Sequence, residues 1–339
     1  MVRKDLGKLT RGEMTGARIK RTVLAATVFV LVALHSACSA GVYDEKFERT
    51  LKVDGPVRLE VETGSGRIEV RGGARGRVVI RGEVRISGIF TLAEERRVKQ
   101  VAANPPISQV GNVIRLDKDR SGRPGGFSIT YIVETPEDTR LEATAGSGNI
   151  EVSGIHGPAK LRTGSGRIEV ENIGDDVTAS TGSGGCRFSR IAGRVSFTVG
   201  SGGATMEDVR DDIRGTAGSG LLQIERPGGR VAVETRSGGI TVRDAKADLR
   251  AEAGSGVLDI SGSPAAHSYW ELSTGSGGII LNVPSSASFR LHALTRSGKV
   301  QTDLPIAIEE QTRNELRAQI GSGDARVEAR TSSGSIHIH

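Results

Sequence analysis

Residues 163–180 read TGSGRIEVENIGDDVTAS, and the following residue, Thr181, begins the same phrase again as TGSGGCRF. The opening phrase, a small residue followed by Gly-Ser-Gly and then alternating residues, recurs with small variations from TGSGRIEV at Thr63 to TSSGSIHI at Thr331. Seven of its serines are spaced 18 residues apart, which identifies an internal repeat. They are Ser147, Ser165, Ser183, Ser201, Ser219, Ser237 and Ser255.

Each repeat unit carries the periodicity of β-strands. In the unit of Ser165, the inward candidates lie three, five, eight, twelve, fourteen and sixteen residues after the serine: Ile168, Val170, Ile173, Val177, Ala179 and Thr181. Steps of two put side chains on one face of a strand, and larger steps fall at corners. Because one unit cannot bury its own apolar face, successive units must stack in parallel, about 4.8 Å apart. The sequence predicts an all-β fold, a single-stranded parallel β-helix (β-solenoid) with 18-residue coils over residues 145–339.

Equivalent residues of successive coils should stack into rows, here called ladders. We expect a serine ladder at one corner, where the flanking glycines supply the positive φ angles of sharp turns. The residue eleven after each serine should lie at the opposite corner, and its charge alternates through five units. Opposite charges one coil apart favour this register more than they add stability. This charge ladder is Asp176, Arg194, Asp212, Arg230 and Asp248.

The interior should alternate large and small side chains between coils. Phe197 faces the position of Gly215 in the next unit, so that the ring can fill the space that the glycine leaves. Cys186 falls on an inward position and is expected to be a buried, inert thiol. Trp270, in one of the longer units after Ser255, is expected to cover an irregular part of the core.

The repeat is interrupted between Ser65 and Ser147. We assign residues 47–144 to an N-terminal β region and cap, because an open solenoid end must be covered. The capping box Thr91-Leu92-Ala93-Glu94 predicts a short helix near 91–104. At the other end, the last copy stops the chain in mid-strand at Ile336–His339 with little visible cover.

The N-terminus has the pattern of an export signal. A basic segment precedes the apolar run from Val23 to Leu34, which is too short to span a bilayer comfortably. The run ends Leu34-His35-Ser36-Ala37-Cys38, which resembles the lipobox of bacterial lipoproteins, although His35 stands where an aliphatic residue is usual. We therefore predict a signal peptide at 1–37, lipidation of Cys38 and a tether at 38–46; the alternative is an ordinary signal peptidase site nearby. The long basic lead-in leaves open whether Met1 or Met14 is the start.

Charge and chemistry exclude several function classes. The net charge of +6 is concentrated at the N-terminus: without the seven basic and two acidic residues of 1–37, 39 basic residues face 38 acidic ones, which argues against a nucleic-acid partner. The pairs Asp175-Asp176 and Asp211-Asp212 are typical of turns, and Gly-Ser-Gly opens a strand rather than the helix of a phosphate loop. His337 and His339 are only two ligands for a metal. We expect no catalytic residues, cofactor or metal.

The repeats, the strand Tyr131–Pro136 that precedes them, and the terminal TSSGSIHI together resemble the bacterial putative-adhesin domain family, whose function is unknown. The resemblance covers roughly residues 47–339. It implies a solenoid fold and carries no catalytic or ligand residues over to this chain.

The leading hypothesis is a non-enzymatic protein of the cell envelope, an outer-membrane or periplasmic lipoprotein held in the membrane by a lipid on Cys38. As an adhesin-like scaffold it would present a rigid surface to a protein or glycan, and its ends could associate with one another. One alternative is a carbohydrate-active β-helix enzyme, a lyase or hydrolase, which would need a groove lined by carboxylates from adjacent coils. Another is an accessory part of envelope stress signalling.

Overall fold

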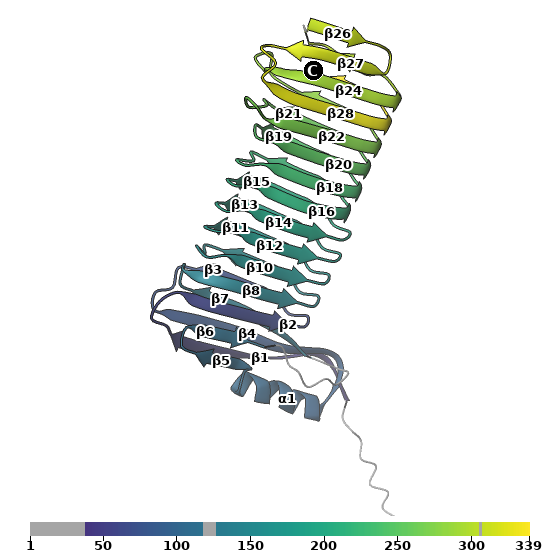
Figure 1. Ribbon diagram of the computed structural model, residues 1–339. Coiled ribbons are helices and arrows are strands. Elements are labelled where there is room, and N and C mark those ends of the chain that lie inside the picture. Colours follow the sequence, from purple (N-terminus) through teal and green to yellow (C-terminus); the bar gives the residue numbers. More distant parts are fainter. Residues whose placement is uncertain (1–37, 118–126, 305–306) are drawn as a thin grey trace, which may run out of the picture. The chain divides into compact units, whose positions relative to one another are not determined.

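The computed structural model describes residues 38–117, 127–304 and 307–339; for residues 38–40 it describes the backbone alone. The predicted signal peptide, 1–37, lies outside these residues. The described chain is a stack of coils, each contributing one strand to each of two facing sheets (Figure 1). The predicted β-solenoid is thereby confirmed.

One helix and two sheets make up this stack. The helix is α1 (Leu92–Ala103). Sheet A contains, in spatial order, β1 (Cys38–Lys52), β4 (Arg77–Thr91), β7 (Ser128–Thr135), β3 (Ile68–Gly72), β9 (Ile150–Ser153), β11 (Ile168–Ile173), β13 (Cys186–Ile191), β15 (Ala204–Val209), β17 (Leu222–Glu225), β19 (Ile240–Ala245), β21 (Leu258–Gly262), β23 (Ile279–Asn282), β29 (Ile336–Ile338) and β25 (Val300–Thr302). Sheet B contains β26 (Ala307–Gln311), β27 (Glu315–Ile320), β24 (Phe289–Ser297), β28 (Ala325–Ser333), β22 (Tyr269–Ser276), β20 (Leu249–Ser255), β18 (Val231–Ser237), β16 (Ile213–Ser219), β14 (Val195–Val199), β12 (Val177–Thr181), β10 (Ala159–Thr163), β8 (Thr139–Ala145), β2 (Val57–Thr63), β6 (Val113–Leu116) and β5 (Ile107–Val110).

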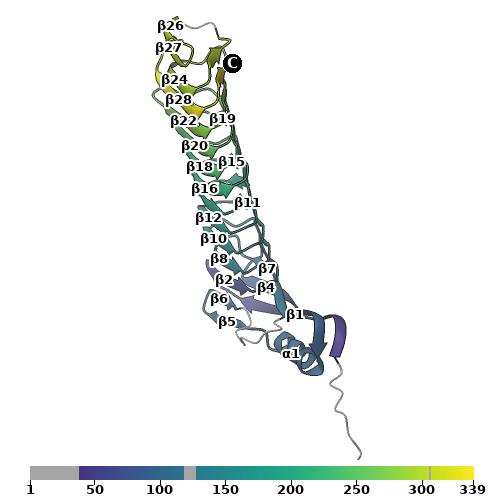
Figure 2. The ribbon, with the colours of Figure 1, turned by 90° about the vertical axis from the view of Figure 1, so that its right-hand side faces the viewer.

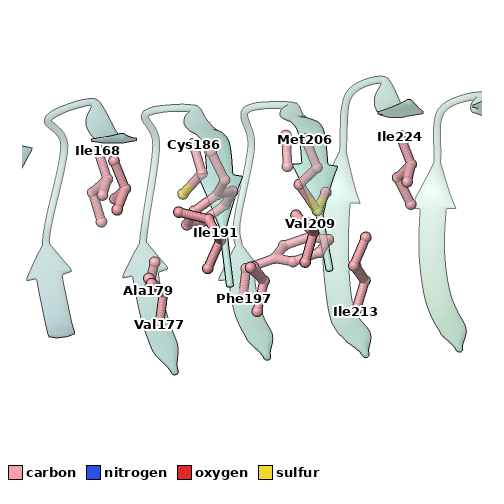
Figure 3. Close-up of a cluster of buried hydrophobic side chains, with 14 of the residues drawn as sticks. Ile168, Val177, Ala179, Cys186, Ile191, Phe197, Met206, Val209, Ile213 and Ile224 are labelled. Atoms are coloured by element: carbon pink, nitrogen blue, oxygen red, sulfur yellow. The ribbon is translucent and has the colours of Figure 1, made fainter. Parts of the chain in front are cut away.

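The 18-residue register holds in the strand pairing. Ile168 lies opposite Cys186, and Val177 lies opposite Val195, each pair 18 residues apart in parallel strands. All six inward candidates in the unit of Ser165 are buried. In Figure 3, Cys186, Phe197 and Met206 point into the space between the two rows of strands. The core is therefore a narrow, filled apolar interior that runs through the coils.

Large and small side chains interlock between coils as predicted. Phe197 lies opposite Gly215, and a Cβ added at that glycine would come within 2.3 Å of the Phe197 ring. The cap uses the same device, because a Cβ at Gly82 would lie 2.0 Å from the ring of Phe47. Trp270 is fully buried and donates its indole N–H to the Ala247 carbonyl oxygen at 2.8 Å, which confirms its expected place in the core.

The corner glycines serve a different purpose from the one expected. In the coils up to Ser201 they do not adopt the left-handed φ that we predicted. Their hydrogen atoms instead allow backbones of adjacent coils to touch: a Cβ at Gly166 would lie 1.9 Å from the carbonyl oxygen of Gly148. Close approach between coils therefore requires glycine here, and the expectation of positive φ was wrong for this part of the ladder.

At the N-terminal end, antiparallel strands and α1 cover the stack (Figures 1 and 2). β1 pairs with β4 along its whole length, from Cys38 opposite Thr91 to Lys52 opposite Arg77. Residues 38–46, for which we expected a tether, thus lie within a paired strand. The predicted helix is α1, and its capping box at Thr91 and Glu94 is formed on both sides. β2 and β3 form the first coil, beneath β8 and β9.

At the C-terminal end the coils are not stacked in chain order. The last strands, β28 and β29, lie between the coil of β22 and β23 and that of β24 and β25. The antiparallel hairpin of β26 and β27 lies beyond β24. The expectation that Ile336–His339 would end the chain with little cover was therefore wrong, because β29 has a strand on each side.

Candidate functional site

The predicted serine ladder lies at the exposed corner where each coil passes from sheet B to sheet A. All seven serine side chains are exposed. Ser183 and Ser201 donate their backbone N–H groups to glycine carbonyl oxygens of the preceding coil, at 3.1 and 2.9 Å. Farther along, Ser219, Ser237 and Ser255 lie directly opposite one another in adjacent strands. The ladder is an edge of glycine backbone and hydroxyl groups, without large side chains.

Buried threonines two residues before the serines hold this corner together. Thr163 donates to the Gly148 carbonyl oxygen at 2.9 Å, and Thr181 donates to that of Gly166 at 3.0 Å. Each hydroxyl also accepts the N–H of the second glycine of its own Gly-Ser-Gly at 3.1 Å. Thr235 occupies the same position, but its buried hydroxyl has no hydrogen-bond partner. The sequence had marked Thr181 only as an inward residue.

The predicted charge ladder lies at the opposite corner, and its members contact one another in part. The Nη2 of Arg194 lies 3.1 Å from Oδ2 of Asp176, whose other oxygen accepts the Arg194 backbone N–H at 2.9 Å. Arg230 lies between Asp212, which accepts its backbone N–H at 3.0 Å, and Asp248, 3.2 Å from its Nε. These side chains are exposed or half-exposed, so the pairs act mainly on register.

A second ladder, which sequence reasoning missed, lies seven residues after each serine. Five successive non-glycine residues there adopt left-handed backbone angles, with φ between 51° and 59°: Asn172, Arg190, Asp208, Arg226 and Asp244. The sequence signal is the three-residue step between the fifth and eighth positions of each unit, which leaves one extra residue at the turn. Such a conformation costs an ordinary L-residue about 1–2 kcal/mol.

This left-handed ladder also carries ion pairs. Nε of Arg226 lies 2.7 Å from Oδ1 of Asp208 in the coil before, and Glu207 contacts the same guanidinium. The hydrogen bond from Arg226 lowers the pKa of Asp208, while the bonds to Asp208 and Glu207 raise the pKa of Arg226. Arg190 similarly contacts Glu171.

Sheet A carries a charged outer surface near its N-terminal coils. A shallow groove of about 230 Å³ is lined there by four glutamates from three adjacent coils, Glu69, Glu151, Glu169 and Glu171. This is the type of groove that the enzyme alternative requires. Each of these carboxylates lies within 4.0 Å of an arginine nitrogen, however, including Arg67, which is 3.3 Å from Glu69 and 3.8 Å from Glu151. The glutamates are thus arranged as partners of arginines.

A larger groove of about 1050 Å³, lined by both polar and apolar residues, runs along the corner that follows the sheet A strands in the later coils. Its lining includes Arg226, Asp244, Lys246, Asn282 and His339. His339 also pairs with Asp303, its Nδ1 lying 2.7 Å from the carboxylate. The charged side chains of this lining are the basic Arg226 and Lys246 and one carboxylate, that of Asp244.

The outer face of sheet B carries an uncharged patch on β12, β14 and the part of β16 that follows Arg214. Thr178 lies opposite Ser196, and Ser180 lies opposite Thr198, which faces Thr216 in the next strand. We call these five residues the hydroxyl patch. Their side chains are exposed or half-exposed, and neighbouring strands hold them at the spacing of about 4.8 Å. The repeat analysis had treated these positions only as solvent-facing.

The remaining reactive groups are isolated or buried. The described residues contain no group of three or more His, Cys, Asp or Glu residues that could hold a metal ion. The His337 and His339 rings stack 6.1 Å apart. Cys186 is buried, and burial raises the pKa of its thiol to about 12. Cys38 begins β1. In the described part of the chain, none of the helices has the length and apolar character needed to span a membrane.

Comparison with known proteins identifies the family of this chain. The Toastrack DUF4097 family model matches residues 132–339. The chain belongs to this family. Solved structures similar to the toastrack chain include a putative adhesin from Bacteroides fragilis, with 11% identity over 87% of this chain and 97% of that chain and a TM-score of 0.40. Another is a putative cell adhesion protein from Clostridium sporogenes, with 12% identity over 87% of this chain and 99% of that chain and a TM-score of 0.22. A putative lipid binding protein from Parabacteroides distasonis is also similar, with 12% identity over 87% of this chain and 96% of that chain and a TM-score of 0.31. No curated protein matches the toastrack chain.

Proposed function

We propose that this toastrack protein is a non-enzymatic scaffold of the cell envelope, anchored by a lipid on Cys38, whose solenoid presents the hydroxyl patch to a glycan. The observation that carries the proposal is the repetition of outward-facing residues on open strand surfaces. Such surfaces suit a long, repetitive ligand better than a small molecule, which binds in an enclosed, largely apolar pocket.

The hydroxyl patch favours a glycan over a protein as the ligand. Serine and threonine hydroxyls each donate one hydrogen bond and accept two, which matches the mixed donor and acceptor character of sugar hydroxyls. The patch offers no large apolar side chain, whereas protein interfaces are centred on buried aromatic and apolar anchors. Charged side chains flank it: Lys160 and Arg162 lie on β10, Arg214 of β16 lies opposite Ser196, and Glu234 of β18 lies opposite Thr216.

Binding to envelope polysaccharides tests the proposed ligand. The mature chain should co-sediment with purified envelope polysaccharide and leave its chain length unchanged. Replacing Ser196→Ala and Thr198→Val together should weaken binding at least about threefold, because two hydroxyls at the centre of the patch are lost. The matched control is Thr205→Val with Thr241→Val, which removes two half-exposed hydroxyls from the outer face of sheet A. Turnover of the polysaccharide, without recovery of any envelope partner, would support the enzyme alternative instead.

The lipid anchor has its own test. Mass spectrometry of the mature N-terminus should find a diacylglyceryl group on Cys38, and Cys38→Ala should release the protein from the membrane fraction. An N-terminus at another residue without lipid would support the alternative of an ordinary signal peptidase site.

A further inference from the structure

The ribbon of β1 and β4 has an apolar tip on one of its two faces. Val42 lies opposite Ser87, and Ile89 lies opposite Ala40. Directly opposed residues share a face of an antiparallel pair, as do residues two apart along a strand. Val42 and Ile89 are therefore on the same face, and their exposed fractions are 62% and 77%. Leu92, the first residue of α1, is 52% exposed close by in the chain.

The opposite face of the ribbon is covered. Ile86 and Phe90 are buried there, Tyr43 lies 6.4 Å from Phe90 between ring centroids, and the Lys99 ammonium of α1 lies 5.8 Å from the Tyr43 ring. The helix thus supplies a core for one side of the ribbon. The exposure of Val42 and Ile89 shows that the described chain supplies none for the other.

Among the β1 and β4 residues of this face, the exposed large apolar side chains lie only at the end nearest Cys38. Farther along the same face, opposite charges lie directly across the ribbon: Asp44 from Arg85, Lys46 from Glu83 and Glu48 from Arg81. The last pair is 3.0 Å apart. Charged pairs of this kind are typical of a strand surface that faces solvent. The change to valine and isoleucine marks the segment next to Cys38 as facing a different environment.

Cys38 is held close to this apolar tip. It pairs with Thr91 at the end of the ribbon, and Val42 follows four residues later in the same strand. At about 3.4 Å per residue, Val42 lies roughly 14 Å from Cys38 along the strand. Ile89 is nearer, because its partner Ala40 is two residues from Cys38. With no flexible linker between them, a lipid on Cys38 would bring both side chains to the depth of the headgroups.

We infer that Val42 and Ile89 form a membrane-docking tip that enters the headgroup region of the bilayer holding the Cys38 lipid. This inference rests on the lipid anchor proposed above. The anchor supplies attachment, and the tip supplies orientation: burial of apolar side chains on one face of a paired ribbon fixes which side of the solenoid meets the membrane. The hydroxyl patch is then held in a defined direction from the bilayer.

Site-specific labelling of the full acylated protein in phospholipid vesicles tests the docking. An environment-sensitive fluorophore on Ile89→Cys is compared with one on Ile308→Cys, an exposed isoleucine of β26. Cys186 is buried, which protects it from labelling. A quencher attached to the lipid should reduce emission at position 89 at least about twofold and leave position 308 unchanged. Adding Val42→Glu to the Ile89→Cys variant should restore the emission, and Trp270 fluorescence checks that the variants are folded.

The outcomes separate the two proposals. Acylated protein in which position 89 is quenched no more than position 308 overturns the docking tip and leaves the anchor standing. Position 89 shielded from water without quenching by lipid, and in a way that depends on protein concentration, means that a second copy covers the tip, which also overturns the inference. A mature chain without lipid on Cys38 overturns the anchor and the docking together.

Discussion

A pair of threonines offers a direct measure of what holds the coils together. Thr181 and Thr235 occupy the same position of the repeat, and their side chains are 3% and 1% exposed. Thr181 donates to the Gly166 carbonyl oxygen and accepts from the Gly184 N–H. The Thr235 hydroxyl is buried without a partner. Valine fits this position sterically, because Val199 occupies it in another coil.

The two substitutions to valine should therefore have opposite effects. Thr181→Val removes two hydrogen bonds and leaves a carbonyl oxygen and an N–H at the corner to find other partners, so we expect the free energy of unfolding to fall by about 1–3 kcal/mol. Thr235→Val replaces a buried, unbonded hydroxyl by a methyl group. We expect it to leave stability unchanged or raise it by about 1 kcal/mol.

Urea unfolding followed by Trp270 emission gives the change in stability. Because long repeat proteins can unfold in parts, amide hydrogen exchange at Gly184 should be measured beside it. In Thr181→Val the Gly184 amide should exchange faster, by the factor that corresponds to the lost free energy. Equal destabilisation by the two variants would refute the reasoning, since only packing would then matter. So would a neutral Thr181→Val.

Three further perturbations test other parts of the architecture. Gly164→Ala should destabilise the fold by about 2 kcal/mol or more, because its Cβ would lie 2.5 Å from a carbonyl oxygen of the coil before. The control Gly64→Ala has open space around its Cβ and should change the melting temperature little. Arg190→Gly removes the strain of a left-handed backbone conformation, so it should leave the stability measured by denaturant unfolding unchanged or raise it. Arg187→Gly, at an exposed strand position of the same coil, should lower it by about 0.5–1 kcal/mol. Glu94 has a pKa below its ordinary 4.5 because it accepts the Thr91 backbone N–H, so its contribution to α1 is complete above pH 4.5 and is lost as the pH falls through the lowered pKa. The protection of the α1 amides against exchange, relative to the intrinsic rate at each pH, should fall over that range, and Glu94→Gln should flatten the dependence.

The regular coils could be predicted well because the residue pattern within each coil indicates its register. Eighteen-residue spacing and inward positions such as Ile168 and Val177 are local signals, and each is repeated in the neighbouring coil, so an error in one unit would be exposed by the next. The helix cap was predictable for the same reason, since Thr91 and Glu94 interact within one turn. The purpose of the glycines was not predictable, because contact between Gly148 and Gly166 depends on how closely two coils approach.

The order of coils at the C-terminal end could not be deduced from spacing. TRSGKVQT at Thr295 and TSSGSIHI at Thr331 both have the pattern of a coil, and either could stack on the coil of Thr274. The choice depends on pairing between segments far apart in the chain. The docking tip is equally hidden, because Val42 and Ile89 become neighbours only through the antiparallel register of β1 and β4.

Insertion of the last coil changes how the solenoid resists opening. A terminal coil that is paired on one side can separate from the stack without disturbing any other coil, which is how ends of repeat proteins fray. β29 is bonded on both sides: His339 exchanges backbone hydrogen bonds of 2.9 Å with Val283 and Leu281, and the Ile338 carbonyl oxygen accepts the Asp303 N–H at 3.0 Å. To release the chain end, the coil of β24 and β25 must separate from β28 and β29. The coil of β28 and β29 is therefore held in place by the coil of β24 and β25, which precedes it in the chain. Opening this end of the stack requires both of these coils to move.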